Sequence, residues 1–146
     1  MADQNTTSYA LNPYLTVKGA ADAIAFYQKA FGAKENHRMP AEDGKRLMHA
    51  ELSINGGIIM MSDEFPEYSS DQCAAVPAPT ADKPAGVAIA LHFGTPPEVD
   101  AAFQRAVDAG CKSAMAPEDT FWNARFAMLS DPFGHRWMLN APLPQK

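Results

Sequence analysis

The two halves of this 146-residue chain follow one pattern, and this internal repeat limits the possible folds more than any other feature. Each half starts with a short apolar strand and continues through a loop into an amphipathic helix. The helix is followed by Gly and, two residues later, by Lys. The first copy covers Tyr14–Val17 and Gly19–Phe31, and the second covers Val87–Phe93 and Pro96–Ala109. Such a repeat indicates two similar modules, and paired modules usually form a cleft.

The helix of each module is marked by periodicity and by its ends. In the first, Ile24, Tyr27 and Phe31 recur at helical spacing. In the second, Thr95 and Glu98 have the spacing of a capping box at the first turn. Both signals predict one helix in each half.

Strand patterns follow each helix. They cover residues 33–39, 47–54 and 58–62 in the first half, and 112–116, 122–130 and 136–140 in the second. Asn55-Gly56-Gly57 predicts a hairpin, and Asp131-Pro132-Phe133-Gly134 predicts a tight turn. The order β-α-β-β-β in each half predicts an α+β fold: two paired modules with curved mixed sheets, helices on the outer faces and a concave cleft. We predict modules at 1–64 and 86–146, joined by a linker at 65–85, in one compact domain.

Composition excludes several classes of protein. The net charge of −5 and the absence of a basic cluster argue against nucleic-acid binding. No apolar run reaches the roughly 18 residues of a membrane span, and the polar start of the chain has no signal-peptide core. Two cysteines, Cys73 and Cys111, do not make a disulfide framework. We therefore expect a soluble cytoplasmic protein.

Six motifs resemble those of the vicinal oxygen chelate superfamily, which contains glyoxalases, bleomycin-resistance proteins and extradiol dioxygenases. The greatest resemblance is to its PhnB-like branch, also called demethylubiquinone methyltransferase-like. The motifs are Asn12-Pro13-Tyr14, Ala23–Tyr27, Met48–Glu51, Ile59–Asp63, Thr120–Trp122 and Asp131–Trp137.

The resemblance implies a divalent metal in most members, held by residues on the concave faces. The ligand positions of glyoxalases correspond here to Asn12, Met60, Ala88 and Met138. Divalent ions such as zinc bind imidazole and carboxylate groups, which these residues lack. The resemblance therefore predicts no cofactor at the usual positions. A divalent metal would need a displaced site, for which the candidate ligands are His49, Glu51 and His92.

Strand alternation assigns side chains to the two faces of each sheet. In 47–54, Met48 and alternate residues after it should face the helix, so His49 and Glu51 face the cleft. In 87–93, His92 faces the cleft, and in 136–140, Met138 and Asn140 do.

In 122–130, alternation places Arg125 in the cleft, with Trp122, Phe126 and Met128 in the core; a shift of one residue would reverse this assignment. We also expect Trp137 in the core and His135 exposed in its turn. The predicted ligand-binding residues are His49, Glu51, Met60, His92, Arg125, Met138 and Asn140.

Two functions remain open. The first is a small-molecule binding protein of the bleomycin-resistance type, which needs a shaped cavity and no metal. The second is a lyase, isomerase or dioxygenase. It would use the displaced metal site, or metal-free acid–base chemistry with Glu51 and His92 as catalytic candidates and Arg125 as a further oxyanion donor. A methyltransferase is disfavoured because no Gly-rich nucleotide-binding loop follows a strand. We also expect a homodimer, because isolated sheets leave open edges.

Overall fold

The computed structural model describes residues 9–70 and 75–145. The chain forms two compact units: Met1–Gln28 with Gly32–Pro79, and Lys29–Phe31 with Thr80–Lys146. The boundary at Pro79 therefore falls inside the segment predicted to be a linker. Cys73 lies outside the described residues.

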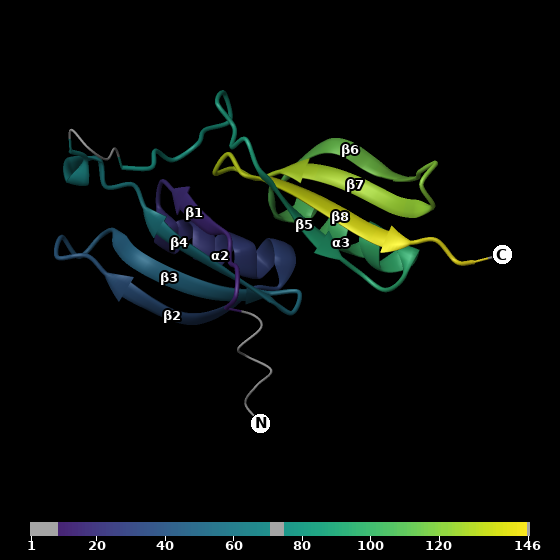
Figure 1. The fold of residues 1–146 in the computed structure, drawn as a ribbon, viewed down its shortest axis with the longest axis horizontal. Helices are drawn as coiled ribbons and strands as arrows, with labels where there is room; N and C mark the ends of the chain where they lie inside the picture. Colours follow the sequence, from purple (N-terminus) through teal and green to yellow (C-terminus); the bar gives the residue numbers. More distant parts are fainter. Residues whose placement is uncertain (1–8, 71–74, 146) are drawn as a thin grey trace. The chain divides into compact units, whose positions relative to one another are not determined.

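The first unit contains β1 (Tyr14–Val17), α2 (Ala20–Phe31), β2 (Lys34–Pro40), β3 (Leu47–Ile54) and β4 (Gly57–Asp63), followed by the short 3₁₀ helix η1 (Pro66–Tyr68) (Figure 1). Its strands have the order β1-β4-β3-β2. β1 runs parallel to β4, and the other pairs are antiparallel. The predicted β-α-β-β-β order is confirmed.

The start of α2 is fixed by a residue of β4, the strand next to β1. Gly19, at φ 90°, provides no capping side chain. Asp63 does so instead: its Oδ1 accepts the backbone N–H groups of Gly19 at 2.7 Å and Ala20 at 2.9 Å, and its Oδ2 accepts that of Leu47 at 2.8 Å. One buried carboxylate thus joins α2, β3 and β4.

The hairpin predicted between β3 and β4 forms with Asn55 and Gly56 at positive φ. The start of β3 differs from the prediction. A register shift between Met39 and Pro40 interrupts the pairing of β2 with β3. Beside it Leu47 is buried, whereas Met48, predicted to pack in the core, is 39% exposed.

The second unit repeats this arrangement. It contains β5 (Ala88–His92), α3 (Pro96–Ala109), β6 (Lys112–Asp119), β7 (Ala124–Ser130) and β8 (Arg136–Pro142), in the order β5-β8-β7-β6. β5 is parallel to β8. The predicted capping interaction forms: the Glu98 carboxylate accepts the Thr95 backbone N–H at 2.9 Å.

The turn between β7 and β8 is organised by Asp131, as predicted for a turn-forming residue. Its Oδ1 accepts the backbone N–H groups of Phe133 at 2.8 Å and His135 at 3.0 Å. Its Oδ2 accepts the indole N–H of Trp137 at 2.8 Å. Because this turn folds onto its own carboxylate, His135 is buried; the prediction of an exposed His135 was wrong.

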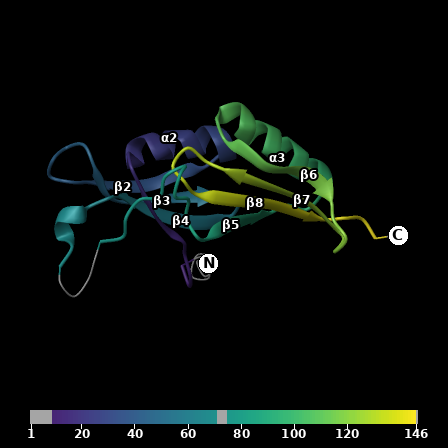
Figure 2. The same cartoon turned by 90° about the horizontal axis from the view of Figure 1, so that it is seen from above.

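The two sheets also share their registers. Lys34 at the start of β2 pairs with Ser53, and Lys112 at the start of β6 pairs with Ser130. In each unit the helix covers one face of the sheet (Figures 1 and 2). The opposite face, which we call the open face, carries the side chains that alternate with the core. Among the described residues, no helix is both long and apolar enough to cross a membrane.

Candidate functional site

The open face of the first sheet carries the residues predicted there. Glu51 of β3 and Met60 of β4 are directly paired, and their neighbours Ala50 and Met61 are fully buried on the helix side. His49 lies two residues from Glu51 on the same face. The placement of His49, Glu51 and Met60 is therefore confirmed, although their role in ligand binding stays a prediction.

Glu51 forms a hydrogen-bonded cluster that sequence analysis missed. It is only 5% exposed, and its Oε2 accepts the Tyr9 hydroxyl at 2.8 Å and the Asn36 amide at 2.9 Å. Burial is the largest single influence and would raise the pKa of Glu51. The two hydrogen bonds and the neighbouring His37 and His49 outweigh it, so that the pKa is lowered. Glu51 is thus an ionised acceptor at neutral pH.

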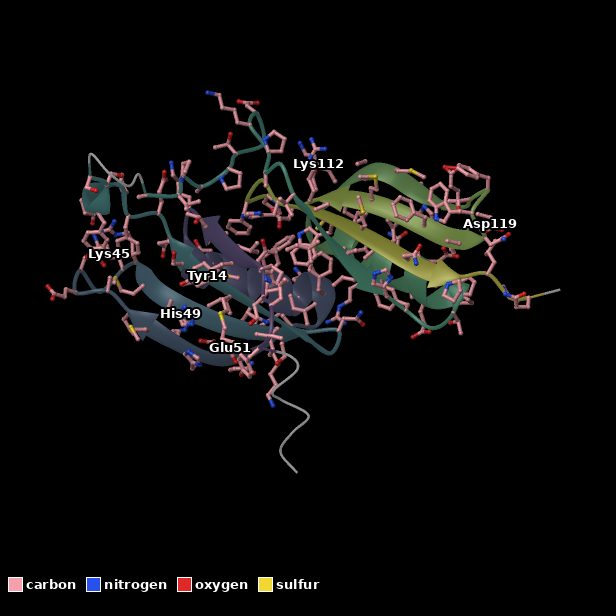
Figure 3. All side chains as sticks on the ribbon, viewed as in Figure 1. Tyr14, Lys45, His49, Glu51, Lys112 and Asp119 are labelled. Atoms are coloured by element: carbon pink, nitrogen blue, oxygen red, sulfur yellow. The ribbon has the colours of Figure 1, made fainter. Side chains whose placement is uncertain are left out.

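His49 is oriented by two neighbouring rings, one of which is that of Tyr14, labelled in Figure 3. The Tyr14 hydroxyl lies 2.8 Å from His49 Nδ1, and the His37 ring centroid lies 5.3 Å from that of His49. Burial raises the pKa of Tyr14, against a smaller opposing effect of a hydrogen bond with Ser62. The phenol therefore keeps its proton, and when it donates to Nδ1 the neutral imidazole carries its own proton on Nε2. Alternation along β1 was the available signal for Tyr14.

The open face of the second sheet carries three of the predicted residues. His92 of β5 is paired with Asn140 of β8, and the Asn140 amide nitrogen lies 3.4 Å from His92 Nδ1. Met138 lies two residues before Asn140 on β8, and the alternate residues Trp137 and Leu139 are fully buried. These placements are confirmed.

The placement of Arg125 on the open face was wrong. Arg125 is paired with Ala141, which is fully buried on the helix side. Its guanidinium forms ion pairs with Asp100 of α3 at 2.9 Å and Asp119 at 3.1 Å. The reason is the turn after β7: Ser130 pairs with Arg136, so residues 131–135 separate the two strands, whereas a four-residue turn would have paired Arg125 with Asn140. Arg125 therefore joins sheet to helix and is not a ligand donor on the open face.

The same register puts the aromatic and sulfur side chains of β7 on the face opposite to the predicted one. Phe126 is paired with Asn140, and Met128 with Met138, on the open face. Trp122, which precedes the strand, is 51% exposed and contacts the rings of Phe121 and Phe126. The predictions of core positions for Trp122, Phe126 and Met128 were wrong.

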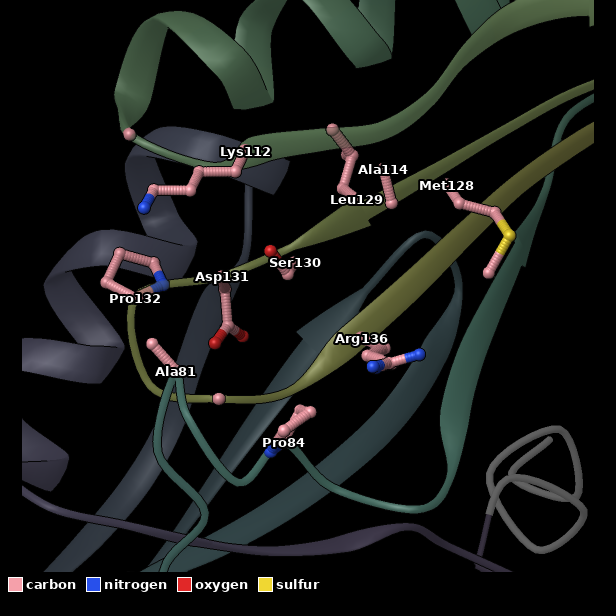
Figure 4. Close-up of a pocket in the computed structure, with 12 residues that line it drawn as sticks. Ala81, Pro84, Lys112, Ala114, Met128, Leu129, Ser130, Asp131, Pro132 and Arg136 are labelled. Carbon is pink, nitrogen blue, oxygen red and sulfur yellow. The ribbon is translucent and has the colours of Figure 1, made fainter.

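A pocket of about 480 Å³ lies within the second unit, where β5 and β8 begin. Arg136, Met128 and Met138 line it, together with the segment Pro84–Ala88, which begins with the last two residues of the predicted linker. A second pocket of about 480 Å³ also has Arg136 and Met128 in its wall and extends to Lys112 on β6 (Figure 4). Alternation along β8 places Arg136 on this face, but nothing in the sequence indicates that the linker lines it.

Comparison with known proteins decides the family. The model of the glyoxalase/bleomycin resistance protein/dioxygenase superfamily matches residues 8–139. The chain belongs to this superfamily. It is 42% identical over 134 residues to an uncharacterised protein of Mycobacterium bovis. This alignment covers 92% of the chain and 84% of that protein.

Solved structures agree with the architecture. TioX from Micromonospora sp. ML1 is similar with a TM-score of 0.69 and 24% identity, covering 92% of this chain and 100% of that one. The PhnB protein from Bacillus cereus is similar with a TM-score of 0.65 and 19% identity, covering 92% and 99%. The neighbours thus include the PhnB-like proteins indicated by the motifs.

The metal implied for glyoxalase superfamily enzymes does not fit the residues at the corresponding positions. Asn12 donates its side-chain amide to the Ile58 carbonyl at 3.2 Å, and Met60, Ala88 and Met138 offer only thioether or methyl groups. Within residues 9–70 and 75–145, no group of three or more His, Cys, Asp or Glu side chains could hold a metal ion. The displaced set His49, Glu51 and His92 draws on both units and stays a prediction.

Proposed function

We propose that the protein binds a small organic molecule on the open face of its second sheet, without a resident metal. The observation that carries this proposal is the pocket of about 480 Å³ lined by Met128, Met138 and Arg136. Ligand sites typically enclose about 300–1,000 Å³ and combine apolar walls with a few polar groups. Thioethers supply adaptable apolar contact, and the guanidinium supplies one charged donor.

The side chains at the glyoxalase ligand positions support binding without a metal. Met60, Ala88 and Met138 can contact an apolar ligand, but they cannot polarise a bound oxygen or activate water as a coordinated metal does. The same residues therefore favour a binding role of the bleomycin-resistance type over a metal-dependent lyase or dioxygenase.

Methionine methyl groups provide a direct test. Protein labelled with [methyl-¹³C]methionine is titrated, in the presence of EDTA, with compounds that raise its melting temperature in a metabolite screen. We expect the methyl signals of Met128 and Met138 to move, because both lie in the pocket wall. The signal of Met61, which is fully buried on the helix side of the first sheet, serves as the control.

Two results would contradict the proposal. One is that no compound moves the signals of Met128 and Met138. The other is that they move only after EDTA is removed and a divalent metal is added. Replacement of each residue by Leu assigns the two signals with little change in volume.

A second candidate function is metal-free acid–base catalysis on the first sheet. It is favoured by the 2.8 Å contact of Tyr14 with His49 Nδ1 and by the ionised Glu51 beside them. An oriented imidazole and a carboxylate can remove a proton next to a carbonyl group. Proton NMR in deuterium oxide would show this as loss of the α-proton signal from small 2-oxoacids and ketones. In Glu51→Gln and in His49→Gln the α-proton signal should remain. Exchange that persists in both variants contradicts this candidate.

The homodimer also remains a proposal. Each described sheet has two edge strands, β1 and β2 in the first and β5 and β6 in the second, and unpaired edges favour association. Light scattering should give about twice the chain mass of 15.8 kDa. A mass equal to one chain at micromolar concentration would exclude the dimer.

A further inference from the structure

A row of polar side chains crosses the open face of the second sheet at one end. The pairing places Lys112 of β6 opposite Ser130 of β7, and Ser130 opposite Arg136 of β8. Ser130 therefore lies between two cationic side chains on neighbouring strands, as Figure 4 shows. All three line the second of the two pockets of about 480 Å³.

Lys112 and Arg136 differ from the three arginines that form ion pairs within the protein. Arg38, Arg46 and Arg125 each form ion pairs with carboxylates on the protein itself. In the described part of the chain, neither Lys112 nor Arg136 has an ion pair or a hydrogen-bond partner for its side chain. Their charges are therefore available to a bound molecule.

Asp131 is the one carboxylate in the wall of this pocket, and its oxygens are engaged elsewhere. They accept hydrogen bonds from two backbone N–H groups of the turn and from the Trp137 indole. With Lys112 and Arg136 counted, the ionised side chains of the pocket wall sum to one positive charge. The pocket is thus electrostatically suited to an anion.

The next row of the open face is apolar. Met128 is paired with Met138, and Met138 with Ala90. A molecule that reaches from the first row to the second passes from two cations and a hydroxyl to two thioethers and a methyl group within one strand repeat, about 7 Å. The face is therefore polar at one end and apolar beyond it.

We propose that this face recognises an amphipathic anion: a carboxylate, sulfonate or phosphate group bound by Arg136, Lys112 and the Ser130 hydroxyl, attached to an apolar body that lies across Met128 and Met138. This proposal rests on the proposed binding function and adds the chemical class of the ligand. Arg136 can bind two oxygens of such a group at once, and Lys112 adds a point charge from the neighbouring side.

A matched pair of fluorescent probes tests the charge separately from the apolar body. 1-Anilinonaphthalene-8-sulfonate carries the anionic group, and N-phenyl-1-naphthylamine has the same ring system without it. Both are titrated into wild type, Arg136→Gln, Lys112→Gln and the control Lys45→Gln. Lys45 is an exposed lysine of the first unit, so its replacement removes the same charge away from the pocket.

We expect the sulfonate to bind about three- to tenfold more weakly to Arg136→Gln and to Lys112→Gln, as for exposed charge-assisted contacts. The neutral probe should bind all four proteins equally, and Lys45→Gln should match wild type. Arg136 and Lys112 are exposed, so circular dichroism should show unchanged folding in both variants.

The outcomes separate this inference from the function on which it rests. Binding of both probes to wild type, with equal sulfonate affinity in all variants, overturns the anion site and leaves small-molecule binding intact. An equal loss of sulfonate affinity in Lys45→Gln also overturns it, because the effect would then follow net charge alone. Failure of both probes to bind wild type overturns the binding function, and the inference with it.

Discussion

Replacement of Asp63 by alanine should be the most destabilising change in the first unit outside its apolar core. The Asp63 carboxylate is 5% exposed and accepts three backbone N–H groups at 2.7–2.9 Å. Two of these donors begin α2 and the third begins β3. Alanine leaves all three donors without their partner in a region from which water is largely excluded.

The magnitude follows from those contacts. Hydrogen bonds to a charged group contribute about 1.5–3 kcal/mol each, and their contributions are not additive when one group is removed. We therefore expect Asp63→Ala to lower the free energy of unfolding by about 3–5 kcal/mol. For a chain of this length that corresponds to a fall in melting temperature on the order of 10 °C.

Asp43 provides a matched control. Its Oδ1 accepts the backbone N–H groups of Lys45 and Arg46 at 2.8 and 2.9 Å, and its Oδ2 accepts Arg46 Nε at 2.7 Å. These bonds lower the pKa of Asp43 from 3.8 to about 2, and the bond from the Arg46 backbone N–H has the largest effect. Asp43 is exposed, so water can replace its contacts in Asp43→Ala.

Urea unfolding followed by circular dichroism compares the two variants at neutral pH. Asp63→Ala should shift the midpoint far more than Asp43→Ala. Similar shifts would refute the reasoning that burial, and not the number of hydrogen bonds, determines the loss. A melting temperature of Asp63→Ala equal to that of wild type would refute the assigned role of the carboxylate in joining α2 to its sheet.

Three further results are expected. Because the folded-state pKa of Asp43 is lowered, its stabilisation is present above its ordinary pKa of 3.8 and is lost as the pH falls toward about 2, so Asp43→Asn should flatten the acid side of the stability profile in that interval. Burial raises the pKa of Cys111 to about 12, so in a Cys73→Ser background a disulfide reagent at pH 8 should label Cys111 only after unfolding; rapid native labelling would contradict its burial. Trp137→Ala should cost about 3–5 kcal/mol of stability, whereas Trp122→Ala should cost less than about 1 kcal/mol, and comparable losses in thermal unfolding would argue against the exposed position of Trp122.

The sequence predicted the elements well where one local signal determined each. The helix Ala20–Phe31 and the strand Tyr14–Val17 follow from apolar spacing, and the hairpin at Asn55 follows from residues that tolerate positive φ. Alternation along β8 correctly placed Met138 and Asn140 opposite the buried Trp137. Each of these inferences needed only the residues within one strand or turn.

Two of the failures come from the turn between β7 and β8. Arg125 was placed on the wrong face because the pairing of Ser130 with Arg136 leaves residues 131–135 between the strands, one residue more than the predicted four-residue turn. His135 was predicted to be exposed because a turn is usually on the surface, but this turn closes on the Asp131 carboxylate. Hydrogen bonds from distant segments, such as that from Tyr9 to Glu51, could not be predicted from strand patterns.

Because the two sheets share their registers, residues at equivalent positions of the two units can be compared directly. Aligning Ser53 with Ser130 through their paired lysines makes the positions of β3 and β7 equivalent. Two helix-facing positions then carry identical residues, Ala50 with Ala127 and Leu52 with Leu129. Two outward-facing positions differ, since Glu51 corresponds to Met128 and His49 to Phe126. The same sheet therefore accepts different side chains at equivalent outward positions: an imidazole and a carboxylate in the first unit, and a phenyl ring and a thioether in the second. Redesign of binding specificity in this protein can accordingly be confined to the outward positions of one copy, with the other copy kept as the internal reference for folding.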